Sequence, residues 1–277
     1  MKHFPLVVIM LIALNSQAQQ TYVPDDNFET FLEFYGMGNG IPDDDSVTTA
    51  NISGVASISP MAMGITDLTG IEGFTSLTSL GCSFNQLTSL DLSQNPDLYD
   101  LDCYQNQLTS LNLSQNSVLT VLDCASNQLT SLNVSQNPNL KAFYCAGNLL
   151  TSLDVSQNPL ITTLACSFNP LECLNVKSGN NAFILNFQVT DCPTLTCIQV
   201  DNAEWSILNW TYVDPQISFS NYCSIPCSVG IEALHSTPKQ LLKIVDLMGR
   251  ETPYRSNTVL IYMYSDGTIE RVFALNE

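Results

Sequence analysis

The sequence predicts a β-rich solenoid, a stack of coils in which each coil carries two short strands joined by turns. The first observation is a repeat of 21 residues, which leucines, cysteines and asparagines keep over five units. The second is that each unit consists of two near-copies, of 10 and 11 residues. The third is an alternating Leu-x-Leu pattern in each half, which is typical of a short strand. Neither half is long enough to hold a helix as well.

Four series of residues define the register of the repeat. They are Leu87, Leu108, Leu129, Leu150 and Leu171; Cys82, Cys103, Cys124, Cys145 and Cys166; Asn85, Asn106, Asn127, Asn148 and Asn169; and Asn95, Asn116, Asn137 and Asn158. The asparagines fall at the expected turns, where a side-chain amide can bond backbone groups that the bending chain leaves unpaired. We therefore expect the asparagines to form a ladder along the stack.

Both halves of a unit follow the pattern Leu-x-x-Leu-x-(Leu or Cys)-x-x-Asn, as in residues 87–96 (LTSLDLSQNP) and 98–107 (LYDLDCYQNQ). These residues resemble the leucine-rich-repeat superfamily, and the nesting is similar to a bacterial subclass with a 21-residue, double-strand repeat. The resemblance covers about residues 65–200. Residues 65–74 (ITDLTGIEGF) are similar to the longer repeats of internalin-type proteins. The resemblance implies a leucine-rich-repeat solenoid.

The first 18 residues have the pattern of a secretory signal peptide, with Lys2, an apolar stretch at 4–14 and small residues ending at Ala18. We expect cleavage after Ala18 and a secreted or outer-surface location. No segment approaches the roughly 20 apolar residues of a spanning helix, so no membrane span is expected. The predicted organisation after the signal is an N-terminal cap at 19–64, repeats at 65–200, a C-terminal cap at 201–227 and a separate domain at 228–277.

A short amphipathic helix is predicted ahead of the repeats. Its apolar positions follow the i, i+3, i+4, i+7 spacing, with aspartates before them as caps and a glycine after them as a stop. These residues are Phe28, Phe31, Leu32 and Tyr35, with Asp25, Asp26 and Gly36. We expect the apolar side of this helix to cover the open end of the solenoid, a need that every repeat protein has.

Three consecutive aspartates, Asp43, Asp44 and Asp45, follow the predicted helix. The segment superficially resembles acidic calcium loops of the thrombospondin type, and carboxylates can hold a hard cation. The matching acidic positions before Gly40 are missing, so a solvated acidic turn is the simpler interpretation. The loop is a weak calcium candidate, and the sequence predicts no other metal and no cofactor.

Charge is concentrated in the body of the chain. Residues 19–227 hold 20 Asp and Glu against Lys141 and Lys177, whereas residues 228–277 hold six acids and five bases. This shift supports a domain boundary near residue 227. Because binding to phosphate-rich partners needs clustered Lys and Arg, the acidic body argues against nucleic acid as a partner.

The cysteines fall into two groups. The five in the repeat take the place that leucine or valine takes in the other half, so we expect buried thiols that do not pair with one another. Disulfides are expected among the others in an exported chain, and Cys197 with Cys223 is the first choice. These candidates are Cys173, Cys192, Cys197, Cys223 and Cys227.

The tail has two strand-like runs, at 241–250 and 260–272, with an Asp-Gly turn at Asp266. It resembles the C-terminal sorting domain of type IX secretion cargo in Bacteroidetes, whose hallmark is a strand ending in Asp-x-x-Gly-Arg, here Asp246 to Arg250. The resemblance implies that the type IX secretion machinery recognises the tail. A clear Pro-x-Pro entry segment is missing and the tail is short. A final β-cap of the solenoid is the alternative.

Catalysis is not expected. The two histidines, His3 and His235, lie in the signal and the tail, so no histidine dyad or triad can form in the body. Acids such as Asp100 and Asp102 are available, but a regular solenoid surface has no insertion to enclose a substrate. We therefore expect a protein that is not an enzyme.

Comparison of the coils with one another predicts where a ligand binds. The Leu-Thr-Ser-Leu half hardly changes, whereas the half with cysteine varies at outward positions that carry aromatic and acidic residues. Exposed rings supply apolar contact area at little entropic cost, so a protein or carbohydrate ligand outside the cell is expected. The alternative is a structural surface protein with no specific ligand. The candidate ligand-binding residues are Phe84, Tyr99, Asp100, Asp102, Tyr104, Asp123, Tyr144 and Phe168.

Overall fold

The structure is a computed structural model of the 277-residue chain. It describes residues 18–224, 227, 241–245, 250, 258–264 and 269–274. The chain divides into two compact units, Met1–Gly230 and Ile231–Glu277. The predicted signal peptide, apart from Ala18, lies outside the described residues, as do both histidines. No helix among the described residues is long and apolar enough to cross a membrane.

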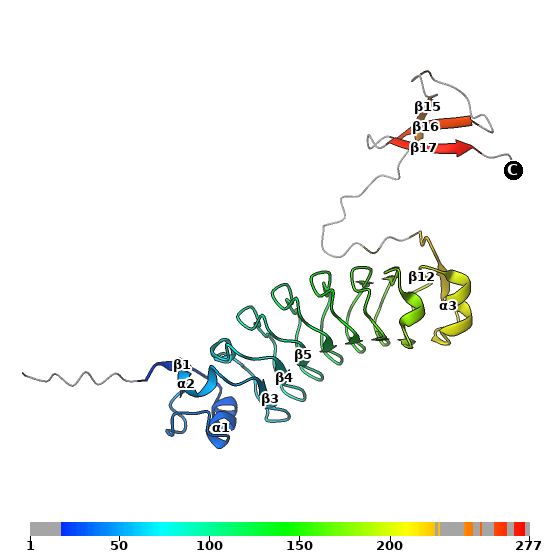
Figure 1. Ribbon diagram of the computed structural model, residues 1–277. Coiled ribbons are helices and arrows are strands. Elements are labelled where there is room, and N and C mark those ends of the chain that lie inside the picture. The colour runs from blue at the N-terminus through cyan, green and yellow to red at the C-terminus, as the bar shows by residue number, and fades with distance from the viewer. Residues whose placement is uncertain are drawn as a thin grey trace, which may run out of the picture. The chain divides into compact units, whose positions relative to one another are not determined.

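The first unit is a β-solenoid of about eight turns, visible as the row of stacked coils in Figure 1. Its main feature is an eight-stranded parallel sheet to which each turn contributes one strand. The strand order is β13-β11-β9-β7-β6-β5-β4-β3. The bounds are β3 Ser57–Ile58, β4 Ser79–Gly81, β5 Asp100–Asp102, β6 Val121–Asp123, β7 Ala142–Tyr144, β9 Thr163–Ala165, β11 Asn186–Val189 and β13 Tyr212–Val213.

The register of this sheet follows the 21-residue repeat. Leu80 lies beside Leu101, Leu101 beside Leu122, and Leu122 beside Phe143. These central residues are buried, while both flanking residues of each strand reach the outer face. The alternation arises because successive side chains of a strand point to opposite faces. The sheet also extends beyond the repeat limits that the sequence pattern gave, to β3 at one end and β13 at the other.

The opposite half of the coils forms a shorter sheet. Its order is β14-β12-β10-β8, with bounds β8 Ser152–Asp154, β10 Cys173–Asn175, β12 Cys197–Gln199 and β14 Ser218–Ser220. The prediction of two strands in every coil was therefore wrong for the first three repeats, where 88–91, 109–112 and 130–133 contain no strand. Neighbouring coils keep a single backbone bond at the start of this segment, as from the Gln107 N–H to the Leu87 carbonyl, and the ladder of bonds that a strand pair needs begins only with β8 and β10.

The N-terminal segment combines an antiparallel strand pair, β1 Gln20–Tyr22 and β2 Ser46–Thr48, with the helices α1 Asp26–Phe34 and α2 Thr49–Ile52. The helix α1 forms where the apolar spacing predicted it. Phe28 is fully buried and its ring stacks on that of Phe74 at 6.4 Å. Tyr35 was expected on the apolar side of the helix, but it lies just past the helix end and is 63% exposed.

Asp25 caps α1 and ties it to the first repeat. One carboxylate oxygen accepts from the N–H groups of Asn27 and Phe28, and the other accepts from Thr66 and Asp67. Burial alone would raise the pKa of this carboxyl, but the hydrogen bonds, led by those from Thr66, lower the pKa overall. The cap is thus both a helix signal and a tertiary contact.

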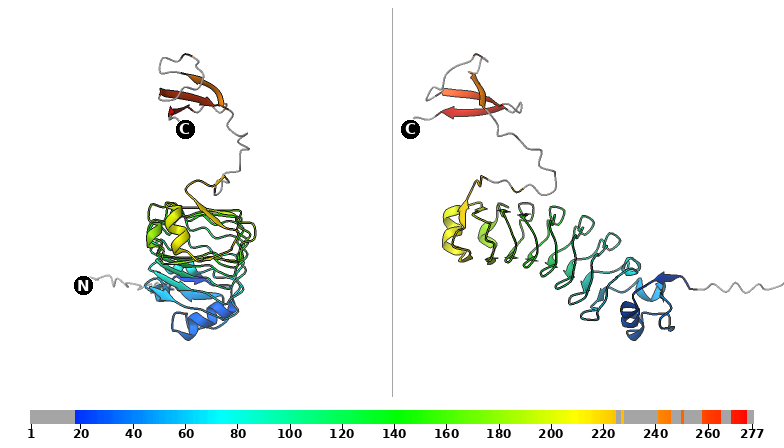
Figure 2. Two further views of the ribbon diagram at one scale, coloured as in Figure 1. Left: turned by 90° about the vertical axis from the view of Figure 1, so that its right-hand side faces the viewer. Right: turned by 180° about the vertical axis from the view of Figure 1, so that it is seen from behind.

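The short 3-10 helix η1 Ile71–Gly73 lies in the first repeat, whereas the 3-10 helix η2 Asn181–Phe183 and the helix α3 Ala203–Asn209 lie towards the C-terminal end of the solenoid. The right-hand view in Figure 2 shows α3, in yellow, at the end of the stack. Trp210 is nearly buried there. Its ring stacks on Phe187 at 3.9 Å and meets the rings of Trp205 and Phe219. This aromatic cluster closes the apolar core.

Two disulfides lie in the same region. Cys197 pairs with Cys223, as expected, and Cys173 pairs with Cys227. Cys192, which was also a candidate for a bridge, is a free and buried thiol, as are the five repeat cysteines. The two bridges join the last coils to the segment that leads out of the solenoid.

The second unit contains a three-stranded antiparallel sheet of order β15-β16-β17, with bounds Leu241–Val245, Thr258–Tyr264 and Ile269–Ala274. Of the proposed sorting motif only Arg250 is described, and Asp246 and the Asp266 turn lie outside the described residues. The sheet has one strand more than the two runs that the sequence indicated.

Candidate functional site

The outer face of the eight-stranded sheet brings together part of the predicted site. Residues at the third position of successive strands form one row, and their backbones are paired in register. The row runs Gly81, Asp102, Asp123, Tyr144 and Ala165. Asp100 lies in the parallel row formed by the first positions. Asp100, Asp102, Asp123 and Tyr144 are each partly exposed, so their side chains are available to a partner.

The remaining candidates lie on the two edges of that face. Phe84, Tyr104 and Phe168 belong to the turns that follow the strands, and Tyr99 directly precedes β5. The rings of Phe84 and Tyr104 meet edge to face at 5.1 Å. Tyr99 is 48% exposed and Phe168 is 61% exposed. The predicted residues therefore form a central row with aromatic side chains on either side, not one compact cluster.

Hydrogen bonds hold the two central carboxylates in place. Asp102 accepts from the Ser83 hydroxyl at 2.9 Å and from the Tyr104 N–H at 3.0 Å, while Asp123 accepts from the Ala125 N–H at 3.0 Å. Partial burial raises the pKa of Asp123; the bond from Ala125 opposes this shift, and the neighbouring charge of Asp102 adds to it. An incoming cation would relieve this repulsion.

Basic side chains are scarce around this face. Lys141 and Lys177 are the two Lys or Arg residues in the described part of the solenoid. Lys177 is engaged elsewhere, because its Nζ donates to the Asn221 carbonyl and lies 4.4 Å from the centre of the Tyr222 ring. Lys141 precedes β7, on the same edge of the face as Tyr99. The acids of the sheet face are therefore largely uncompensated.

The sequence did not reveal the left-handed backbone conformation of the turns that hold Phe84 and Phe168. The residue two positions after each repeat cysteine has a positive φ, from 53° at Gln105 to 66° at Gly147, and Phe84 and Phe168 stand at such positions. Each of these residues donates its N–H to the next coil, as Phe84 does to Tyr104. The available signal was Gly147, since glycine adopts this conformation without strain. Two phenylalanines in left-handed backbone project their rings outward along one edge.

Groups of the acidic loop near the N-terminus form hydrogen bonds with one another and with Glu29. Glu29, which is 1% exposed, accepts from the N–H groups of Asp44 and Asp45. The Asp44 carboxylate accepts from Asn39 and Ser46. Across the ranges that the structure describes, no group of three or more His, Cys, Asp or Glu could hold a metal ion. Asp43 is not part of this network.

The repeat cysteines do not offer a reactive site. Burial raises the pKa of Cys82 to about 12, and burial also raises the pKa of Cys103, Cys145 and Cys166 well above the usual range of a thiol. The thiolate is the nucleophilic form, so thiols that stay protonated at neutral pH are unreactive. Their role is to fill the core.

Comparisons with known proteins agree with this geometry. A segment of 93 residues is 34% identical to Internalin J of Listeria monocytogenes. The crystal structure of internalin C2 from the same species is 18% identical, has a TM-score of 0.50, and covers 74% of this chain and 88% of that one. The chain carries an internalin-like leucine-rich-repeat solenoid. No protein-family model matches it.

The chain spans only part of the length of the internalins that it matches. The matched segment is 33% of this chain and 10% of Internalin J. A solved structure described as the functional domain of InlJ from Listeria monocytogenes, which includes a cysteine ladder, is 30% identical with a TM-score of 0.49. It covers 66% of this chain and 52% of that chain.

Proposed function

We propose that the chain is an exported, non-enzymatic adhesion or binding protein that presents the outer face of its eight-stranded sheet to a protein ligand outside the cell. The observation that carries the proposal is the composition of that face. Asp102, Asp123 and Tyr144 occupy one row, and exposed rings from Phe84 and Tyr99 lie on opposite edges. Aromatic side chains are enriched at protein interfaces, and uncompensated charges attract a partner of opposite charge.

The internal comparison of the coils supports this face over the opposite one. The scaffold imposes the same demands on every coil, yet the outward positions of the sheet vary while Thr88, Thr109 and Thr130 repeat without change. These threonines are exposed and lie in the other half of the coils, which contains no strand in the first three repeats. Variation confined to one face is what adaptation to a partner produces. Loss of constraint on an unused face would produce it too, and this is the basis of the second candidate.

The second candidate function is a structural surface protein with no specific ligand. It is favoured by the regularity of the solenoid, whose strands pair in the same register from coil to coil. This function predicts self-association or no partner at all. The two candidates differ in how they respond to substitutions on the sheet face, because a structural protein would be indifferent to them.

The test is binding of the chain from residue 19 onward to arrays of extracellular proteins and glycans. The variant replaces Tyr99, Tyr104 and Tyr144 by alanine, and the matched control replaces Thr88, Thr109 and Thr130, which are exposed on the other half of the same stack. We expect a protein hit that the tyrosine variant loses and the threonine variant keeps, with both variants folded. A hit on glycans alone would replace the protein ligand by a carbohydrate, and silence throughout would favour the structural role.

We also propose that the C-terminal unit is an export signal read by the type IX secretion machinery, and that the body then stays at the outer cell surface or is released. The support is the change of composition after residue 227 and the separate sheet of strands β15 to β17. Deletion of residues 228–277 is expected to leave a folded protein inside the cell envelope. Delivery of the truncated chain to the surface would overturn this proposal without affecting the binding proposal.

A further inference from the structure

The solenoid contains two ladders of buried asparagines that differ in one hydrogen bond. In the first ladder each side-chain oxygen accepts from a buried backbone N–H of the preceding coil at 3.0 Å. The pairs are Leu87 to Asn106, Leu108 to Asn127, Leu129 to Asn148 and Leu150 to Asn169. The Nδ2 groups of the same residues donate to backbone carbonyls, as Asn127 does to Cys103 and Cys124. Every member of this ladder uses both ends of its amide.

In the second ladder each asparagine forms hydrogen bonds through the Nδ2 end of its amide only. Its members, Asn95, Asn116, Asn137 and Asn158, are at most 1% exposed. Each Nδ2 donates to two backbone carbonyls at 2.9 to 3.1 Å, for example from Asn137 to Leu113 and Asn116. All four Oδ1 atoms are buried and have no hydrogen-bond partner within the described part of the chain.

The amide orientation is fixed by these contacts. Both partners of each Nδ2 are carbonyl oxygens, which only accept. Turning the amide over would place Oδ1 against two acceptors, so exchanging the nitrogen and oxygen positions does not remove the unpaired acceptor. The missing bond is a property of this half of the coil.

The cause is the extra residue in the longer half of the repeat. In the first ladder two positions separate Asn85 from Leu87, whereas in the second three positions separate Asn95 from Leu98. The longer turn closes on itself, because Leu98 donates its N–H to the Asn95 carbonyl at 3.2 Å. Leu119, Leu140 and Ile161 do the same in the following coils. The N–H that would match the first ladder is therefore already used.

The turn offers few replacement donors. Proline follows the asparagine at Pro96, Pro138 and Pro159, and proline has no N–H. A buried acceptor left without a donor destabilises a fold, because its bond to water is lost and not replaced. Such a loss repeated in four consecutive coils would be large beside the usual marginal stability of a domain.

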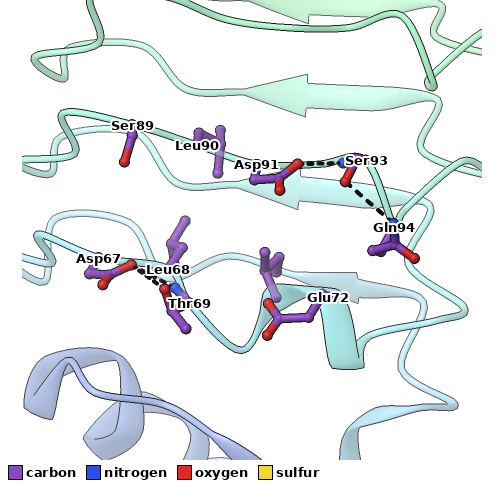
Figure 3. A pocket seen from close by; sticks show the side chains of 10 residues that line it. Asp67, Leu68, Thr69, Glu72, Ser89, Leu90, Asp91, Ser93 and Gln94 are labelled. Carbon is purple, nitrogen blue, oxygen red and sulfur yellow. Dashed lines mark hydrogen bonds between the residues drawn. The ribbon is translucent and has the colours of Figure 1, made fainter.

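Two grooves between the coils are lined in part by residues whose carbonyls accept from asparagines of this ladder. One has a volume of about 360 Å³ and is lined by Asp67, Glu72, Asp91 and Ser93 among others (Figure 3). It includes Ile71, whose carbonyl accepts from Asn95. A second, of about 230 Å³, includes Leu113, whose carbonyl accepts from Asn137. Both are polar in part and large enough for water.

We propose that the second asparagine ladder is a row of internal water sites, with one ordered water per coil donating a hydrogen bond to the Oδ1 of Asn95, Asn116, Asn137 and Asn158. The water donates one hydrogen bond to Oδ1, in place of the backbone N–H that already donates within the turn. Its second O–H donates to a carbonyl or side chain of the groove. Buried waters of this kind make about three hydrogen bonds each and belong to the structure. The first ladder takes no such water because its Oδ1 atoms already accept from the protein.

The test is a crystal structure of the full chain at a resolution that shows ordered solvent. The expected result is a water at about 2.6 to 3.2 Å from each of the four Oδ1 atoms. The internal control is the first ladder, where Asn106, Asn127 and Asn148 should show none. Four unhydrated Oδ1 atoms, or a protein donor on each of them, would overturn the proposal.

A solution measurement provides an independent check. Magnetic relaxation dispersion counts long-lived internal waters, and Asn137→Leu is expected to reduce that count by one while the remaining sites persist. The matched variant Asn127→Leu removes an asparagine of the first ladder, ten residues earlier in the same coil, and is expected to leave the count unchanged. Equal counts in the parent and in a folded Asn137→Leu protein would contradict a water at that position.

Discussion

Asp102 and Asp123 occupy neighbouring positions in the eight-stranded sheet, paired across β5 and β6, with both carboxylates on the outer face. Parallel strands lie roughly 4.8 Å apart, so the two charges are close. The pKa of Asp123 is raised by partial burial and by the charge of Asp102. The face proposed to bind a ligand is thus built with a small electrostatic strain that a basic partner would release.

A first prediction concerns stability against pH. An acid whose folded pKa lies above its unfolded value destabilises the fold when ionised, and this penalty disappears as the pH falls through the folded pKa. Asp123→Asn keeps an acceptor for Ala125 and is therefore expected to stabilise the protein at pH 7, by up to about 1 kcal/mol, with the difference from the parent vanishing near pH 3. Urea unfolding of both proteins at the two pH values measures it.

The control is Asp91→Asn, which is expected to have the opposite sign. The pKa of Asp91 is lowered, first by the bond from the Ser93 N–H. Its contribution should therefore be present at pH 7 and lost as the pH falls through the folded pKa. A loss of stability at pH 7 in Asp123→Asn would contradict the assignment of repulsion to Asp102 and Asp123.

The cap residue Asp25 gives a second prediction. Asp25→Ala removes the N-cap of α1 together with the bonds to Thr66 and Asp67, so a cost of about 2 kcal/mol or more is expected at pH 7. Because the pKa of Asp25 is lowered, the difference from the parent should shrink as the pH falls through that value. Chemical unfolding followed by circular dichroism measures it. Asp26→Ala, an exposed change one residue later, should cost little; equal costs for the two would argue against the cap.

The disulfides give a third prediction. Cys197 and Cys223 are 26 residues apart, and Cys173 and Cys227 are 54 apart. Chain-entropy arguments assign each bridge about 3 to 4 kcal/mol, so replacing either pair by serine should lower the denaturant midpoint clearly. Thiol counting by mass spectrometry of the unfolded, unreduced parent should find six free cysteines. Ten free thiols would show that neither bridge forms.

The two asparagine ladders give a fourth prediction. Asn127→Ala leaves the buried N–H of Leu108 without an acceptor, while Asn137→Ala strands no backbone donor. Asn127→Ala is therefore expected to be the more destabilising of the two, by about 1 to 3 kcal/mol, in equilibrium unfolding with urea. The variants lie in adjacent parts of one coil and remove the same atoms. A larger cost for Asn137→Ala would mean that its carbonyl contacts outweigh the stranded donor.

Part of the binding face was accessible from the sequence because the 21-residue register fixes which residues share a row. Asp102, Asp123 and Tyr144 are a single position of the repeat, so the pattern that predicts the strands also aligns them. The position of Phe84 and Phe168 on a left-handed turn was not readable, because a positive φ at a phenylalanine runs against the preference of that residue. Only the hydrogen bonds to the next coil hold them there.

The sequence by itself determined the solenoid, the inward leucines and cysteines, and the helix that begins after Asp25, because each depends on periodicity or local capping. The tertiary structure decided which halves of the coils become strands. Strand pairing needs a ladder of backbone hydrogen bonds between neighbouring coils, and of the identical Leu-Thr-Ser-Leu segments the last one forms a strand, β8, where β10 supplies a paired neighbour. It also decided that Asn106 has a donor for its Oδ1 while Asn116 has none, because that outcome depends on which N–H the turn has already consumed.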